Sequence, residues 1–223
     1  MTWVANNTDL IIRLTLDHIW LSLIPIVLGA VIAIPLGWVA FRFHPMRGAL
    51  LTSVGIVYTI PSLALFVLLP PVLGLPFLSP ASVIIALTLY AVAIMVRSAA
   101  DAFASVDPSV LRSATALGYE SWQRVLFVEL PLAGPVIIAG LRVVAVSTVS
   151  LVTVGVLVGV QSLGYFFTDG FQRRIEEEIL TGIVMTVFVA ALFDVILLGI
   201  GRAVMPWAKV LQVQATSREV ATR

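Results

Sequence analysis

Cysteine is absent from the 223 residues, and this absence excludes a disulfide scaffold, a thiolate metal site and a cysteine nucleophile. Charge is also scarce. Asp, Glu, Lys and Arg make up 11% of the residues, whereas soluble domains average about 25%. The net charge of +1 gives no basic surface for nucleic acid. Because 60% of the residues are hydrophobic, the sequence predicts an all-α membrane protein.

Two chemical motifs are missing as well. No G-x-x-x-x-G-K-[ST] occurs, so the chain has no P-loop with which to hold ATP. His18 and His44 are far apart, and we expect no metal site; both are interpreted as structural residues near membrane ends. The segment Met1–Thr8 carries no basic residue, which is not typical of a secretory signal, so the first apolar run is expected to be retained.

Long stretches without charge predict the membrane spans. Asp, Glu, Lys, Arg and His are absent from Ile19–Val39, Ala81–Val96, Val143–Val160 and Gly182–Phe193. A spanning helix needs about 20 residues, and the shorter runs reach this length through their neighbours. In one domain, 1–223, we expect five spans at about 19–41, 50–69, 81–96, 135–160 and 181–201.

The basic residues predict the orientation of these spans. If the loop over 97–134 is cytoplasmic, ten of the 13 Lys and Arg residues fall on the inner side or at helix ends facing it. Only Arg13, Arg173 and Arg174 fall outside. The positive-inside rule then places the N-terminus outside and the C-terminus in the cytoplasm. The inner residues are Arg42, Arg47, Arg97, Arg112, Arg124, Arg142, Arg202, Lys209, Arg218 and Arg223.

A polar segment, Asp107–Pro131, separates two apolar runs and is predicted to form a helical elbow. Asp107 suits an N-cap and Pro108 the first helical position. Gly118 permits the left-handed turn that ends one short helix, and Ser121 is expected to cap the next. Pro131 and Pro135 are expected to mark the return to the membrane. Apolar residues recur at helical spacing before the turn (Val110, Leu111, Ala114, Leu117) and after it (Trp122, Val125, Leu126, Val128).

Two interpretations of this elbow are open on physical grounds. It could present a short helix to a groove on a partner protein. It could instead lie as an amphipathic hairpin in the lipid interface, with Trp122 as an anchor.

Sequence motifs favour the first interpretation. Gly118, nine further residues and Val128-Glu129-Leu130-Pro131 resemble the G-x9-I-x-L-P part of the "EAA" loop of ABC-importer permeases, which receives the ATPase subunit. Tyr58–Phe66 resembles the Y-T-I-P-S-L-A-L-F signature of permeases for glycine betaine, carnitine and choline. Ala139–Arg142 resembles their A-G-[IL]-R. On this resemblance, the ATPase-coupling residues are Arg112, Ser113, Ala114, Leu117, Gly118, Tyr119, Glu120, Ser121, Trp122, Val128, Leu130 and Pro131.

The resemblance implies a type I ABC-importer permease core of about five spanning helices with a cytoplasmic coupling loop. It implies transport of osmoprotectant quaternary amines, including proline betaine, across the bacterial cytoplasmic membrane. The expected partners are a second permease, two ABC ATPases that carry ATP and Mg, an extracytoplasmic binding protein and membrane lipid. The alternatives are a permease for methionine or polar amino acids and a non-transporting membrane scaffold for a cytosolic partner.

Some residues depart from the family pattern. Arg112-Ser113-Ala114 stands where the family has Glu-Ala-Ala, and Gly159–Gly164 stands where it has G-A-G-G-L-G. Some of these importers pair two different permeases. The altered motifs therefore suggest one half of a heterodimer.

Polar residues inside two spans form a predicted pathway or gate. Pro61 frees a backbone carbonyl and kinks a helix, either for packing or for gating. The hydroxyl residues of the fourth span either allow close helix packing or line a pathway at a subunit interface. Tyr58 could attract a quaternary ammonium group through cation–π interaction, although the resemblance places strong recognition in the binding protein. The proposed set is Tyr58, Thr59, Pro61, Ser62, Ser147, Thr148 and Ser150, with Thr153 on the same predicted face.

Two charged groups are expected deep in the membrane. Arg142 and Asp194 lie at matched distances from the ends of their spans, and ionisable residues at such depth are usually paired. We therefore expect a structural ion pair; the alternative is that Arg142 reaches lipid phosphates and Asp194 reaches water. Glu176–Glu178 with Arg173 and Arg174 is expected to be a solvated external face, with binding-protein contact as the alternative.

Overall fold

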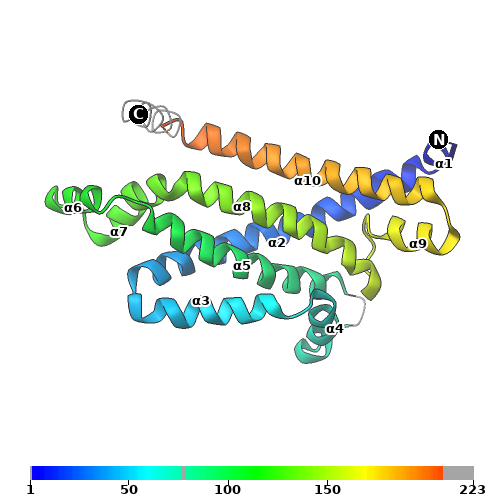
Figure 1. Cartoon of the computed structure of the whole chain (residues 1–223), viewed down its shortest axis with the longest axis horizontal. Coiled ribbons are helices and arrows are strands. Elements are labelled where there is room, and N and C mark those ends of the chain that lie inside the picture. The colour runs from blue at the N-terminus through cyan, green and yellow to red at the C-terminus, as the bar shows by residue number, and fades with distance from the viewer. Residues whose placement is uncertain (1, 77–78, 208–223) are drawn as a thin grey trace, which may run out of the picture.

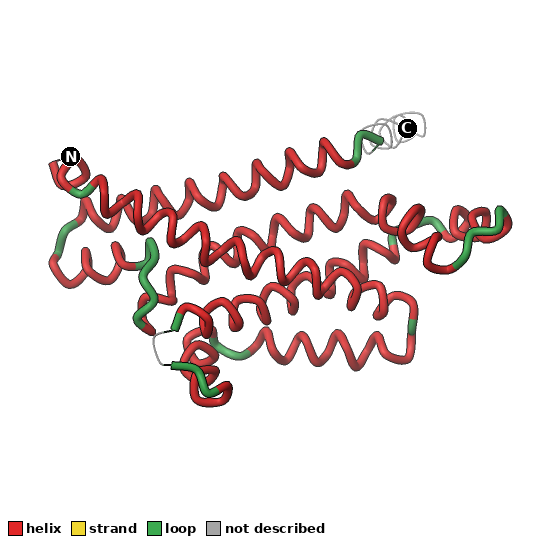
Figure 2. The backbone as a smooth tube through the Cα atoms, turned by 180° about the vertical axis from the view of Figure 1, so that it is seen from behind, coloured by secondary structure: helices red, strands yellow, loops and turns green. Residues whose placement is uncertain are grey.

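Helices account for nearly all of the described chain. The computed structural model describes residues 2–76 and 79–207, and no strand occurs within these ranges (Figure 2). Lys209, Arg218 and Arg223, which contribute to the predicted orientation, lie outside the described residues.

Within the described ranges, four helices are long and apolar enough to cross a membrane, and a bent pair of helices provides a fifth candidate span. A 38-residue helical stretch, Ser121–Val158, contains α8 together with the turns that flank it. The long helices are α2 (Thr8–Arg42), α5 (Pro80–Ala104), α8 (Leu130–Val152) and α10 (Glu176–Val204).

The helices extend beyond the predicted spans. Helix α2 begins at Thr8 rather than near Ile19, and α10 begins at Glu176 rather than near Thr181. Runs without charge mark the part of a helix that hydrocarbon surrounds, because charged residues are costly there. A helix that continues into the headgroup region carries charges, so the sequence pattern underestimates its length.

The predicted second span over 50–69 is broken into two helices instead of forming one kinked helix, and the pair together is still a candidate span. Two helices, α3 (His44–Thr59) and α4 (Ser62–Leu73), meet there at 100°. A proline disfavours helical backbone at the residue before it, and Ile60 before Pro61 is extended, with φ −68° and ψ 128°. The Tyr90 hydroxyl donates a hydrogen bond to the Ile60 carbonyl at this break.

Close packing of α2 against α5 forms the centre of the bundle. Gly29, Ala33 and Gly37 follow one another at four-residue intervals on α2 and are all buried. A side chain at Gly29 would meet Ala91, and one at Gly37 would meet Ala99. Small residues at this spacing let two backbones approach closely, as is common in membrane bundles.

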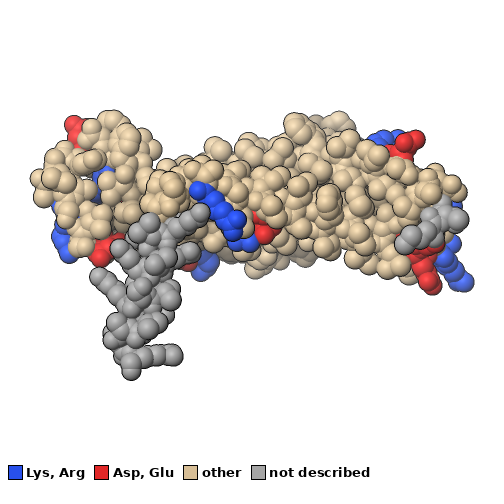
Figure 3. Space-filling view, turned by 90° about the horizontal axis from the view of Figure 1, so that it is seen from above, with Lys and Arg blue, Asp and Glu red and all other residues tan. Residues whose placement is uncertain are grey.

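The two ends of the bundle carry different small helices. Helices α1 (Thr2–Asn6) and α9 (Tyr165–Arg173) lie at one end, and α6 (Pro108–Ala116) and α7 (Ser121–Arg124) lie at the other (Figure 1). Acidic and basic side chains gather mainly at these ends, with a largely uncharged stretch between them (Figure 3). This distribution matches a bundle that crosses a bilayer.

Helix α9 lies in a segment expected to be a loop, and it changes the interpretation of the acidic run that follows. Arg173 pairs with Asp169 within α9 at 3.0 Å. Glu178, however, is only 1% exposed, so Glu176–Glu178 is not a uniformly solvated face. The correction arises because α9 packs against the first turns of α10, where Gly170 lies close to Ile179 and the Cβ of Glu178.

Candidate coupling elbow and membrane cavity

The first arm of the elbow is helix α6, and its start is fixed by a side-chain cap. Asp107 Oδ1 accepts a hydrogen bond of 2.7 Å from the Ser109 backbone N–H. This bond stabilises the charged carboxylate and lowers the pKa of Asp107 below its usual value. Pro108 occupies the first turn, as its fixed φ and missing N–H allow.

Gly118 makes the corner. Its φ is +87°, in the left-handed region that glycine adopts without strain. Its N–H donates to the Thr115 carbonyl at 3.0 Å, and the Tyr119 N–H donates to the Ala114 carbonyl at 3.1 Å. These two bonds form a Schellman motif, which closes α6 and redirects the chain.

The second arm continues directly into the membrane. Helix α7 is followed by a π-helical turn, η1 (Val125–Glu129), and then by α8. In this turn the Leu130 N–H donates to the Val125 carbonyl five residues earlier. We infer that the wider turn accommodates Pro131, which has no N–H to donate. Pro131 therefore lies within a continuous helical stretch. The prediction that the second helix of the elbow is separate from the spanning helix is wrong, because α7, η1 and α8 follow one another without a break.

The predicted cap at Ser121 is also corrected by one residue. Glu120 is the N-cap of α7, and its backbone N–H donates to Gln123 Oε1 at 2.9 Å. The Trp122 indole N–H donates to Glu120 Oε2 at 2.8 Å. Glu120 thus fixes both the start of the arm and the orientation of its tryptophan.

The elbow exposes a cluster of large apolar side chains. Leu117 is 79% exposed, Trp122 57% and Phe127 65%, and the Trp122 and Phe127 rings lie 6.4 Å apart. Of the other predicted coupling residues, Ala114 is buried, whereas Val128, Leu130 and Pro131 are half-buried. The remaining members are exposed: Arg112, Ser113, Gly118, Tyr119, Glu120 and Ser121.

A polar network that the sequence patterns did not predict joins the elbow to the bundle. Glu129 is 2% exposed and accepts hydrogen bonds from Arg124 Nε and from Trp38 Nε1, each at 2.9 Å. Arg124 also donates to the Thr115 hydroxyl at 3.0 Å. Trp38 lies on α2 and Thr115 on α6, so one buried carboxylate and one arginine connect the elbow to a spanning helix. The one sequence feature that could have indicated this network is the charged Glu129 between the apolar residues Val128 and Leu130.

Part of the predicted pathway lines a cavity of 310 Å³ between α3, α5 and α8. Tyr58 contributes an aromatic ring and Ser147 a hydroxyl. Arg97 also lines the cavity and brings a guanidinium group to it, although its position in the sequence predicted only a place at a helix end. The remaining lining residues are Val54, Gly55, Ala93, Ile94 and Val143.

The other predicted pathway residues do not join this cavity. Thr148 is 2% exposed and faces the helix packing, whereas Ser150 is exposed. Thr59, Pro61 and Ser62 lie at the break between α3 and α4, where the Thr59 hydroxyl bonds the Ile56 carbonyl at 2.7 Å. The hydroxyl residues of the fourth span therefore do not form one face: Ser147 lines the cavity, Thr148 is buried between helices and Ser150 is exposed.

Arg142 and Asp194 are in contact, as their matched depth predicts. Arg142 Nε donates to Asp194 Oδ1 at 2.6 Å, and Nη2 donates to Oδ2 at 2.8 Å. The pair joins α8 to α10 in the bidentate geometry that arginine favours. The side chains are 37% and 30% exposed in the single chain, so the pair is half-buried rather than fully buried.

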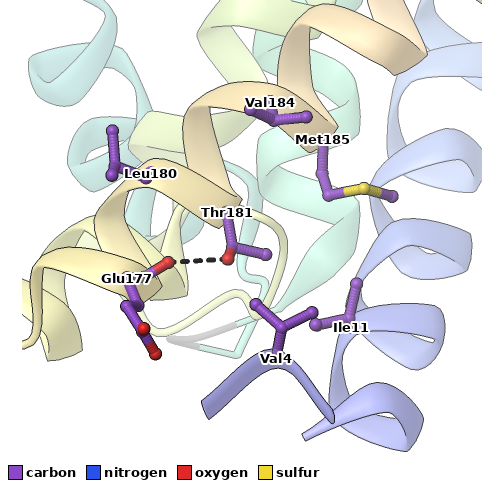
Figure 4. A pocket seen from close by; sticks show the side chains of 7 residues that line it. All are labelled: Val4, Ile11, Glu177, Leu180, Thr181, Val184 and Met185. Carbon is purple, nitrogen blue, oxygen red and sulfur yellow. Dashed lines mark hydrogen bonds between the residues drawn. The ribbon is translucent and has the colours of Figure 1, made fainter. Parts of the chain in front are cut away.

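A second cavity, of 370 Å³, lies between the N-terminal helices and α10 (Figure 4). It is lined mainly by apolar side chains, among them Val4, Ile11 and Met185, and contains none of the predicted pathway residues. The Thr181 hydroxyl donates to the Glu177 carbonyl at 2.6 Å at its edge.

His18 lies in the core of the bundle. It is fully buried and its Nε2 bonds the Val149 carbonyl at 3.0 Å, which ties α2 to α8. Within the described ranges, no group of three or more His, Asp or Glu side chains is placed to hold a metal ion.

Relatives with named functions share most of this chain. The glycine betaine/carnitine/choline transport system permease protein OpuCB of Bacillus subtilis is 32% identical over 92% of this chain and 94% of its own length. The choline transport system permease protein OpuBB of the same organism is 32% identical over 91% of each chain. The osmoprotectant import permease protein OsmW of Salmonella typhimurium is 27% identical over 86% of this chain and 90% of its own.

Solved structures show the same fold. A chain of the MetNI methionine ABC transporter superposes with a TM-score of 0.81 at 21% identity, covering 89% of this chain and 98% of its own. A chain of an amino acid ABC transporter superposes with a TM-score of 0.75 at 15% identity, covering 91% of this chain and 97% of its own. The fold is therefore that of type I ABC-importer permeases.

One family spans most of the residues described above, from within α2 past the end of α10. The family described as "Binding-protein-dependent transport system inner membrane component" matches residues 25–210. This range includes the elbow, the polar network and the cavity. The chain belongs to this family of multi-pass inner-membrane transport components.

Proposed function

We propose that the chain is the permease subunit of an ATP-driven importer of osmoprotectant quaternary amines. The substrate class is glycine betaine, carnitine, choline and proline betaine. The observation that carries the proposal is the 32% identity, over more than nine-tenths of the chain, to permeases named for these solutes. The MetNI structures support the shared fold only, because their identity to this chain is below 25%.

The expected partners follow from the family and from the exposed faces of the structure. A second permease, identical or homologous, covers α3, which buries none of its own residues in the single chain. One ATPase seats on each elbow and carries the ATP and Mg. A binding protein delivers the solute at the α1 and α9 end, and lipid surrounds the apolar faces.

The proposed positions of the ATPases and the binding protein imply an orientation of the chain in the membrane. The elbow faces the cytoplasm and α1 lies outside, because the ATPases act in the cytoplasm. The opposite placement of α1 and of the C-terminal end of α10 along the bundle supports termini on opposite sides of the membrane (Figure 1).

The mechanism is alternating access without covalent chemistry in this subunit. Closure of the ATPases on ATP moves the elbow, and the Arg124–Glu129–Trp38 network transmits the displacement to α2. A rigid connection is needed, because a loose one would absorb the displacement before it reached the spanning helices.

The test is ATP hydrolysis by the complex purified with its co-encoded partners and reconstituted in lipid. Glycine betaine, carnitine or choline, delivered by the binding protein, is expected to stimulate hydrolysis. Stimulation by methionine or a polar amino acid alone would replace the proposed substrate class. A chain that purifies without any ATPase would identify a scaffold instead.

A further inference from the structure

The 310 Å³ cavity between α3, α5 and α8 combines features that suit a small zwitterion. Its walls are mostly apolar, with one aromatic ring from Tyr58, one hydroxyl from Ser147 and one cation from Arg97. Ligand sites of this size are typically apolar with a few polar groups that fix orientation.

Arg97 has no acidic partner among the residues that the structure describes. Asp101, one turn further along α5, is bonded to Arg47 at 3.2 Å. Asp194 is bonded to Arg142 on the neighbouring α8. Arg97 lies seven residues before the end of α5, about 10 Å along the axis, and ionisable residues within membrane spans usually mark substrate pathways.

The aromatic wall of the cavity is held in place. The Tyr58 ring meets the Tyr90 ring edge to face at 5.9 Å, and the Tyr90 hydroxyl is bonded to the Ile60 carbonyl. Tyr58 is nevertheless 52% exposed, so part of its ring is open to a ligand. A quaternary ammonium group binds such a ring through cation–π attraction.

We propose that this cavity is a transient substrate site and that Arg97 selects solutes bearing a carboxylate as well as a quaternary ammonium group. The inference rests on the proposed function. Tyr58 contacts the ammonium end, and Arg97 pairs with the carboxylate of glycine betaine or carnitine. Choline has a hydroxyl in place of the carboxylate, so it leaves Arg97 without an ion pair.

The test compares solutes in the full complex, with the ATPases and the binding protein present and each solute saturating for the binding protein. Arg97→Gln is expected to reduce the maximal rate of glycine betaine uptake by about tenfold, because glutamine cannot form an ion pair with the carboxylate. Choline uptake is expected to change by less than about twofold. Arg97→Lys should recover part of the betaine rate, and Arg202→Gln, on α10, serves as a matched control.

A second pair of variants tests the cavity itself. Gly55 lines it, and a side chain there meets nothing within 4 Å, so Gly55→Leu should fill the cavity without a clash. Uptake of every solute should fall, while Gly199→Leu, in equally open space on α10, should not change it.

Three results overturn the inference while leaving the proposed function intact. They are an equal loss of betaine and choline uptake in Arg97→Gln, no change in either, and a wild-type complex that imports choline but no carboxylate-bearing solute. A wild-type complex that imports none of these solutes removes the proposed function and this inference together.

Discussion

Single residues determine how the elbow is attached to the bundle. Glu129 is buried, and its two oxygens are occupied by donors from Arg124 and Trp38. A buried carboxylate is tolerated only when it is paired and hydrogen-bonded. Because an unpaired Glu129 carboxylate would be costly to bury, arrangements that break its two hydrogen bonds are disfavoured. We infer that the network therefore holds the elbow in one orientation.

Removing the Glu129 carboxylate should weaken both folding and coupling. Glu129→Ala leaves the Arg124 and Trp38 donors without their acceptor, and breaking a buried charged pair typically costs about 3 kcal/mol or more. We expect a lower unfolding midpoint in detergent and ATP hydrolysis that no longer responds to solute. Asp101→Ala, at an exposed carboxylate on α5 outside the elbow, is the comparison. Retention of solute-stimulated hydrolysis in Glu129→Ala would contradict a transmitting role.

The Arg142–Asp194 pair should stabilise the contact between α8 and α10. Asp194→Asn removes the negative charge of the carboxylate that accepts both Arg142 hydrogen bonds. The thermal unfolding midpoint should therefore fall. Asp101→Asn, at the more exposed Arg47 pair, should produce a smaller decrease. In a double-mutant cycle with Arg142→Gln, the two single effects should not add. Additive effects would show that the residues act independently.

At the scale of helices, the elbow depends on one backbone conformation. Gly118 has φ of +87°, which a β-branched residue adopts only as an outlier. Gly118→Val should therefore abolish most transport while the chain still inserts into the membrane, as measured by solute uptake in liposomes. Gly118→Asn should retain more activity, because asparagine tolerates the left-handed region. Equal uptake by Gly118→Val and the wild type would show that the corner is dispensable.

Sequence patterns predicted the elements whose cause is local. Asp107, Pro108 and Gly118 specify a capped start and a left-handed end within one segment. The runs without charge underestimated the lengths of α2 and α10, because charged residues in the headgroup region end such a run before the helix itself ends. The proline at Ile60-Pro61 predicted only a kink, whereas the structure has a 100° break whose Ile60 carbonyl is bonded by Tyr90 from the distant α5.

The features that the sequence did not predict depend on contacts between distant segments. Helix α9 and the burial of Glu178 follow from packing between two elements that no periodicity links. Arg97 lines a cavity with Tyr58 and Ser147 because three helices meet there. Arg142 and Asp194 were an exception, because depth along two spans could be counted from the sequence.

At the scale of the whole molecule, the proposed pair of permeases makes the single chain one half of a pathway. Helix α3 buries no residue of its own, and the cavity beside it is open. Arg112 stands exposed where the "EAA" pattern has Glu. We therefore predict that affinity purification of a tagged chain from its native operon recovers two distinct permeases in equal amounts. An active complex containing only this permease would contradict the heterodimer and leave Arg112 without a structural explanation.

Solute uptake by liposomes that contain the permeases and ATPases, with ATP enclosed and the binding protein outside, tests the proposed import most directly. Glycine betaine should accumulate against its gradient only when both ATP and the binding protein are present. Gly118→Val should remove this accumulation. Accumulation without ATP, or none with every component present, would contradict the proposed import.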